Sequence, residues 1–145
     1  VWSLISDISV SAQFSEEFQG AEWVEGHHAP AVGAQFVGTN QHPAIGEWQT
    51  TSTITELVEN EQFGWAVGED EENAAARWRW EIDELHGHRC RLRHTVRLGP
   101  GPSGLTPAIE AMPDKEALIV DRRQQEHLAN MRRCVEGVKA LAETP

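Results

Sequence analysis

Hydrophobic and polar residues alternate along residues 76–98, and this pattern predicts two antiparallel strands joined by a tight turn. A period of two is typical of strands with one buried and one solvated face. Arginine and acidic side chains dominate the solvated face. The apolar face carries Trp78, Trp80, Ile82, Cys90, Leu92, His94, Val96 and Leu98. His94 is therefore the one polar residue on the side expected to be buried.

The register of this hairpin can also be predicted, because directly opposite residues in an antiparallel pair share a face. A three-residue loop, Leu85 to Gly87, lets Gly87 take the left-handed conformation that such loops need. The outer ion pairs that result are each worth only ~0.2 to 1 kcal/mol. The expected pairs are Trp78–His94, Trp80–Leu92, Ile82–Cys90, Glu81–Arg91, Asp83–Arg89 and the like-charged Arg79–Arg93.

Four more strands are predicted before the hairpin, at residues 21–25, 35–42, 47–58 and 62–68. These segments alternate or are rich in β-branched and aromatic residues, and Gly, Pro and Asn separate them. The acidic run 69–73 is expected to be a solvated turn, since it lacks the spacing of a calcium loop.

The third of these strands, residues 47–58, can take two registers. A four-residue loop, Glu59 to Gln62, places Trp48, Thr50, Ser52 and Ile54 on the face of Phe63 and Trp65. A five-residue loop, Val58 to Gln62, instead turns Leu57, Thr55, Thr53 and Thr51 to that face. We choose the first, because Trp48 and Ile54 then point inward and Thr50 and Ser52 become hydroxyls in an inner wall.

Helices are predicted at both ends of the chain. Val1 to Ile8 and Ser11 to Phe18 indicate two short helices. The connector 99–104, GPGPSG, is incompatible with a helix or strand interior. Asp114 to Glu143 then contains no proline and predicts one long helix, with Pro113 at its first turn. Its expected apolar stripe is Leu128, Met131, Val135, Val138, Leu141 and Ala142.

These elements predict a single α+β domain over residues 1–145. A helix of this length spans ~45 Å and can cover the apolar face of a curved antiparallel sheet, which is an α+β grip rather than a doubly wound sheet. Because the chain starts directly in a helical pattern, we expect a first strand upstream of Val1 that is missing here.

The net charge and the cysteine content limit the classes of binding partner and the cellular setting that can be expected. Twelve Lys and Arg against 23 Asp and Glu give a net charge of −11, which disfavours nucleic acid and anionic lipid surfaces. No apolar run is long enough to insert into a membrane. The chain has two cysteines, Cys90 and Cys134, and their positions do not predict a set of disulfide bonds. This favours a reduced cytoplasmic setting. We expect a monomer or homodimer.

Several segments together are similar to a known family. They are VWSLISDIS at 1–9, VGAQFVGTN at 32–40, the Trp48 strand, ARWRWEI at 76–82, GPGPSGLTPAIEAMPDKEALI at 99–119 and NMRRCVEGVKALAE at 130–143. The chain resembles the polyketide cyclase/dehydrase-like branch of the SRPBCC superfamily, also called START-like or helix-grip proteins. The resemblance implies a cavity between sheet and helix for an apolar or aromatic molecule, such as a lipid, polyketide or quinone. Some relatives cyclise or dehydrate polyketides and others only bind ligands, and no shared catalytic motif can be transferred to residues of this chain.

The aromatic residues on the predicted inner faces are candidates for the lining of such a cavity. Six Trp and four Phe without any Tyr provide large apolar area, and each Trp adds one N–H donor. The alternative is that these rings only fill the core. The candidate ligand-binding residues are Phe36, Asn40, Trp48, Thr50, Ser52, Trp65, Trp78, Trp80 and His94.

His94 is the sharpest candidate, because burial disfavours its charged form and leaves a neutral ring that can bind a ligand carbonyl. The alternative is a core histidine bonded to a neighbouring group. If the protein is an enzyme of the cyclase or dehydratase kind, His94 is the candidate general acid or base, and Asn40 would orient the carbonyl.

No metal or cofactor is expected. The histidines, among them the adjacent His27 and His28, show no H-x-x-x-H spacing, and there is no G-x-S-x-G or phosphate-binding glycine pattern. The leading hypothesis is therefore binding of an apolar or aromatic small molecule, with a cyclase or dehydratase as the alternative. A third class, a module without ligand, would apply if the aromatic residues close the cavity.

Overall fold

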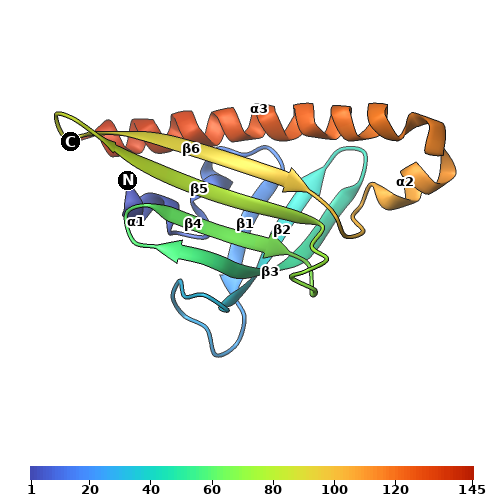
Figure 1. The fold of residues 1–145 in the computed structure, drawn as a ribbon, viewed down its shortest axis with the longest axis horizontal. Coiled ribbons are helices and arrows are strands. Elements are labelled where there is room, and N and C mark those ends of the chain that lie inside the picture. Colours follow the sequence, from blue (N-terminus) through green and yellow to red (C-terminus); the bar gives the residue numbers. More distant parts are fainter.

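The computed structural model describes all 145 residues as one curved six-stranded antiparallel sheet with a long helix against its inner face (Figure 1). The strands follow the chain order, β1 to β6, so every neighbouring pair is a hairpin or a longer antiparallel connection. The strands are β1 Phe18–Trp23, β2 Gln35–His42, β3 Gly46–Val58, β4 Gln62–Val67, β5 Ala76–Leu85 and β6 Arg89–Leu98. The helical elements are α1 Trp2–Ile5, η1 Val10–Gln13, α2 Thr106–Ala111, η2 Pro113–Lys115 and α3 Glu116–Glu143.

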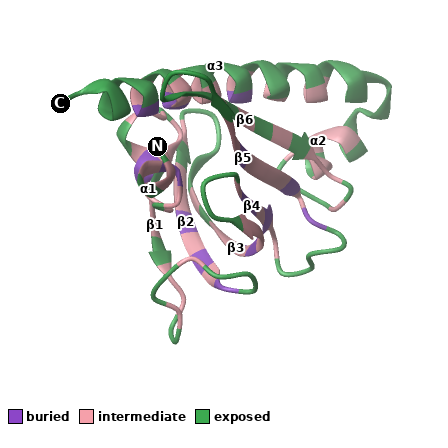
Figure 2. Cartoon of the chain, turned by 60° about the vertical axis from the view of Figure 1, so that its left-hand side comes forward, coloured by how far each residue is buried: buried purple, intermediate pink, exposed green.

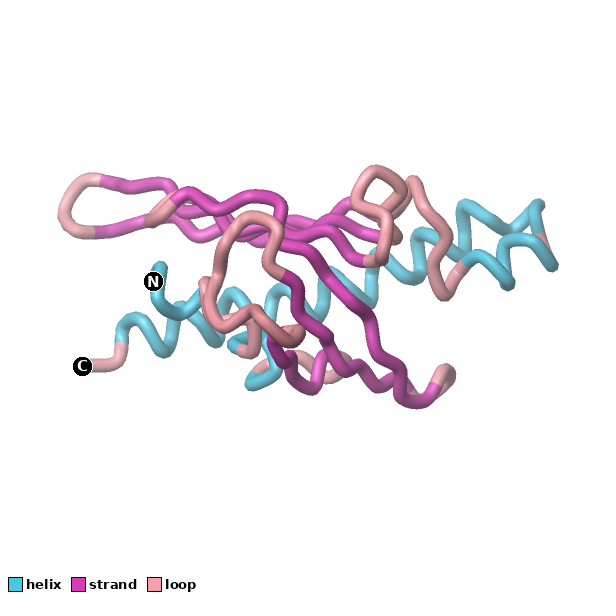
Figure 3. The backbone as a smooth tube through the Cα atoms, turned by 90° about the horizontal axis from the view of Figure 1, so that it is seen from below, coloured by secondary structure: helices cyan, strands magenta, loops and turns pink.

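The predicted fold class is confirmed: the sheet bends around α3, and the short N-terminal helical pieces complete the enclosure (Figure 3). Buried residues gather on the inner side of the strands and on the face of α3 that meets them (Figure 2). The core joins α1, η1, the sheet and α3 through Ile5, Val10, Phe36, Ile54, Phe63, Trp80, Cys134 and Val138. No helix is long and apolar enough to cross a membrane.

The two faces of the β5–β6 hairpin are as predicted, but the predicted register differs from the observed one by two residues. Trp80 lies opposite His94, Trp78 opposite Val96 and Ile82 opposite Leu92. A slip of two leaves every side chain on its original face, so the hydrophobic pattern cannot detect it. The local cause is the turn, which consists of residues 86–88 and contains two successive left-handed residues, with φ of 76° at position 87 and 57° at position 88.

The observed register also improves the charges on the outer face. Arg93 now lies opposite Glu81, and its guanidinium is 2.6 Å from Asp83. Arg79 lies opposite Thr95 instead of Arg93, so the expected like-charged pair does not occur. Arg79 binds Glu56 of β3 across the intervening strand, with 2.6 Å between Nε and Oε2.

In the β3–β4 hairpin, the pairing of the five-residue loop occurs next to the turn, whereas the four-residue-loop register predicts the correct inward face farther along β3 but is wrong in its pairing by two residues. Next to the turn, Leu57 lies opposite Phe63, as the five-residue loop predicts. A β-bulge at Thr55 then adds one unpaired residue, and beyond it Ile54 lies opposite Trp65. Such a bulge moves the rest of the strand to the other face. Ser52 and Thr50 are thereby turned inward, as the chosen register predicts.

The N-terminal helices are shorter than predicted. The expected helix from Ser11 to Phe18 is only the 3-10 turn η1, and Phe18 begins β1. The reason is local: the Ser15 hydroxyl accepts hydrogen bonds from the backbone N–H groups of Glu17 and Phe18, at 3.1 and 2.9 Å. A serine side chain that satisfies backbone donors in this way competes with continuation of a helix.

The inward face of α3 is also displaced from the predicted stripe. Its buried residues are His127, Cys134 and Val138, whereas Leu128 and Leu141 are exposed by 42% and 40%. Gly137 lies on the packed side, since a Cβ there would stand 2.3 Å from the ring of Phe14. The predicted stripe is therefore right at Met131, Val135 and Val138, which face the cavity or the core, and wrong at Leu128, Leu141 and Ala142, which are exposed.

Candidate functional site

A cavity of about 120 Å³ lies between the inner face of the sheet, the N-terminal helical segments and α3. Eight of the nine candidate residues line it: Phe36, Asn40, Thr50, Ser52, Trp65, Trp78, Trp80 and His94. Trp48 shares their face, opposite Asn40, but lies near the β2–β3 turn and is not part of the lining. The structure therefore brings together residues of five strands that are up to 58 positions apart in the chain (Phe36 to His94).

One wall of the cavity is a continuous aromatic surface on β4, β5 and β6. Trp80 and the imidazole of His94 are stacked, with ring centroids 3.7 Å apart and planes 6° apart. Trp78 lies 5.4 Å from His94, and Trp65 stacks on Trp78 at 6.4 Å. Phe63 continues the surface, 5.5 Å from Trp65. Because each ring is held between neighbours, this wall is preorganised for a flat or apolar molecule.

His94 has no hydrogen-bond partner in the protein. Both ring nitrogens, Nδ1 and Nε2, are inaccessible to solvent and unbonded. Burial lowers the pKa of His94 from 6.5 to about 3, so the ring is neutral at physiological pH. The alternative expectation, a core histidine bonded to a neighbouring group, is thus not what the structure shows. Buried polar atoms are rarely left unpaired, and such an exception asks for a physical reason.

A second buried imidazole, His127 of α3, faces the same cavity. Its ring meets Trp78 edge to face, with centroids 5.1 Å apart. Burial, and then the positive charge of Arg123, lower the pKa of His127 to about 4. His127 was not a candidate in the sequence, where it carried no metal-ligand spacing. The signal that could have found it is helical spacing. His127 precedes Asn130 by three residues and Cys134 by seven, and all three residues line the cavity.

Charged groups cluster beside the cavity, where residues at the start of β1 and the end of β2 meet α3. The Arg123 guanidinium is 2.7 Å from Glu17 and 2.9 Å from Glu126, and the Glu126 carboxylate is 3.4 Å from His42. Although burial acts to lower it, the pKa of Arg123 is raised by the hydrogen bond and charge of Glu17. Glu17 lines the cavity but is already neutralised by Arg123.

The remaining polar groups on the α3 side are likewise occupied. The side-chain oxygen of Asn130 accepts hydrogen bonds from the Glu16 backbone N–H at 3.0 Å and from Arg133 at 2.6 Å. The Cys134 thiol contacts the Ser11 carbonyl at 3.8 Å, and burial raises the pKa of that thiol, which disfavours a nucleophilic thiolate. No group of three or more His, Cys, Asp or Glu side chains is placed to hold a metal ion.

Comparison of the chain with protein-family models, with curated proteins and with solved structures gives no match in any of the three. Function is therefore inferred from the geometry and chemistry of the cavity.

Proposed function

We propose that the protein binds a small apolar or aromatic molecule in the cavity between the sheet and α3. The observation that carries the proposal is the pair of buried, unbonded nitrogens of His94 within an otherwise aromatic wall. A packed core would gain stability from an apolar residue at this position, because an unsatisfied buried polar group costs ~1 to 3 kcal/mol. A bound molecule gives one of those atoms a partner once the side chains that cover it move aside. The resemblance to helix-grip proteins agrees with this role.

The size of the cavity restricts the ligand. Drug-sized ligands occupy pockets of roughly 300 to 1,000 Å³, whereas an apolar cavity of about 150 Å³ accommodates benzene. The 120 Å³ found here is suited to a single ring or a chain of similar volume. A polycyclic ligand would need displacement of lining side chains. The walls are supplied by one chain, so the proposal requires no partner subunit, and free Cys90 and Cys134 suit a reducing cytoplasm.

Binding is favoured over acid–base catalysis. A general base is most effective when its pKa lies near the working pH. With a pKa of about 3, His94 accepts hydrogen bonds at neutral pH but takes up a proton poorly. Asn40 and His94 line the same cavity, which the cyclase or dehydratase hypothesis requires. That alternative would need turnover of an enolisable ketone that collapses in His94→Ala and Asn40→Ala.

Native mass spectrometry of protein purified from its own host tests the proposal first, since a retained ligand adds its mass to the folded protein. NMR then locates binding. Only three of the six tryptophans, Trp65, Trp78 and Trp80, line the cavity. Added toluene is expected to shift those three indole N–H signals and to leave the other three unchanged.

A matched pair of variants makes this test specific. Thr50 faces the cavity, and its neighbour Thr51 faces the outer side of the same strand, opposite Val37. Thr50→Phe should fill the cavity and abolish the indole shifts, while Thr51→Phe should preserve them. Unchanged shifts in Thr50→Phe, or no retained mass and no response to any small apolar probe, would overturn the proposal.

A further inference from the structure

The hydrogen-bonding groups of the cavity are unequally satisfied, and this inequality says which ligand fits. Glu17 is held by Arg123, Asn130 by Glu16 and Arg133, and Cys134 contacts Ser11. Against these, both nitrogens of His94 are buried without any partner. Glu17 Oε1 also lacks a hydrogen bond of good geometry but is paired with Arg123, so His94 is the lining residue whose two ring nitrogens are both buried and without any partner.

A neutral imidazole has one N–H donor and one acceptor nitrogen, and the tautomer decides which nitrogen is which. A hydroxyl group both donates and accepts, so it can bond to either nitrogen in either tautomer. A carbonyl can only accept, and a hydrocarbon can do neither. The ring that carries the hydroxyl would contact the tryptophans beside His94, where Trp78 and Trp65 stack 6.4 Å apart.

Charge limits the ligand further. A neutral His94 cannot balance an anion in a dry aromatic cavity, where an uncompensated charge is costly. Arg123 is already engaged by Glu17 and Glu126, so it offers no free positive charge. For a cation, the lining carboxylate of Glu17 is equally occupied, because its partner lies 2.7 Å away.

We propose that the ligand is an uncharged single-ring molecule bearing a hydroxyl group, such as a phenol, which hydrogen-bonds to His94 while its ring packs on the tryptophan wall. This inference rests on the proposed function, and it adds the chemical class of the ligand. The volume of about 120 Å³ accommodates one such ring.

The experiment compares four probes of similar size at pH 7: phenol, toluene, benzoate and benzylamine. Dissociation constants are measured from the cavity indole signals in the natural protein and in His94→Phe, which retains an aromatic ring but has no nitrogen. For each protein, the preference for phenol is the dissociation constant of toluene divided by that of phenol. The decisive quantity is this preference in the natural protein divided by the preference in His94→Phe. This ratio cancels the different hydration of the two probes.

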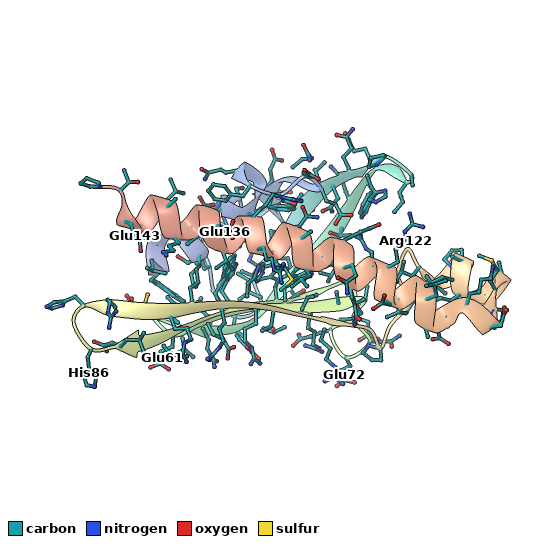
Figure 4. All side chains as sticks on the ribbon, turned by 90° about the horizontal axis from the view of Figure 1, so that it is seen from above. Glu61, Glu72, His86, Arg122, Glu136 and Glu143 are labelled. Carbon is teal, nitrogen blue, oxygen red and sulfur yellow. The ribbon has the colours of Figure 1, made fainter.

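A hydrogen bond to an otherwise unpaired buried group predicts that this ratio is about tenfold or more. His94→Gln, which again offers a donor and an acceptor, should recover part of the preference. His86→Phe is the control, since His86 lies at the tip of the β5–β6 hairpin, away from the space between the sheet and α3 (Figure 4). It should keep the full preference.

The outcomes separate the two proposals. If toluene and phenol bind with the same relative affinity in His94→Phe as in the natural protein, the inference about the hydroxyl is wrong while cavity binding stands. Tighter binding of benzoate or benzylamine than of phenol would also overturn the inference. If none of the four probes binds, both the inference and the proposed function fail.

Discussion

Replacement of His94 by phenylalanine should stabilise the protein at neutral pH and remove part of its sensitivity to acid. Phenylalanine keeps an aromatic ring at the position where the imidazole stacks on Trp80, with ring centroids 3.7 Å apart. It removes the two buried nitrogens that have no hydrogen-bond partner. Leaving one buried polar group unpaired costs ~1 to 3 kcal/mol, so the free energy of unfolding should rise by about that amount at pH 7. A stabilising substitution at a cavity wall is the signature of a residue kept for binding.

The acid dependence follows from the pKa of His94, which is 6.5 as a reference value and about 3 in the folded protein. As the pH falls below 6.5, the unfolded chain takes up a proton that the folded protein does not, so stability is lost until the pH reaches the folded value. Each unit is worth about 1.4 kcal/mol, which gives about 2 kcal/mol lost between pH 7 and pH 5 and about 5 kcal/mol in full. His127 acts in the same direction but is present in both proteins.

Urea unfolding followed by tryptophan fluorescence at pH 7, 6 and 5 measures this difference. The natural protein should lose about 2 kcal/mol more than His94→Phe over that interval. Parallel pH dependences in the two proteins would refute the burial of a neutral His94. A variant less stable than the natural protein at pH 7 would show that the nitrogens have partners in the folded state.

Three further substitutions test the packing around the site, each by urea unfolding. Trp80→Ala should cost ~3 to 5 kcal/mol, because Trp80 is 1% exposed in the core; a loss below 1 kcal/mol would contradict this. Gly137→Ala should destabilise by ~1 to 3 kcal/mol despite the better helix propensity of alanine, since its Cβ would stand 2.3 Å from the ring of Phe14; a more stable variant would argue against this contact. Glu17→Gln should cost ~1 to 3 kcal/mol by leaving Arg123 with a single carboxylate, and unchanged stability would mean that the ion pair is not formed.

The sequence predicts the strands and their faces well, because a period of two is visible wherever one face is buried. It predicts the registers less well. A slip of two residues keeps every face unchanged, so the choice between Trp80 opposite Leu92 and Trp80 opposite His94 depends on the turn conformation at residues 86–88. The bulge at Thr55 escapes prediction for a related reason, since each half of β3 presents the inward face that one of the two continuous registers predicts.

The site shows the same division between pattern and three-dimensional detail. Trp65, Trp78 and Trp80 were found because aromatic residues on an inward face are conspicuous. His127 and Asn130 were missed, because they are polar residues on the inward face of α3, beside Met131 and Cys134, and a hydrophobic pattern does not select them. Whether His94 has a hydrogen-bond partner depends on the neighbours supplied by the tertiary fold, which no spacing in the sequence reveals.

The most direct test of the central claim is a crystal structure of the protein grown with phenol. We expect the ring between β5, β6 and α3, against Trp78, with its oxygen about 2.7 to 3.2 Å from Nδ1 or Nε2 of His94. An aromatic wall closed by its own side chains, with phenol absent or bound elsewhere on the molecule, would contradict the account.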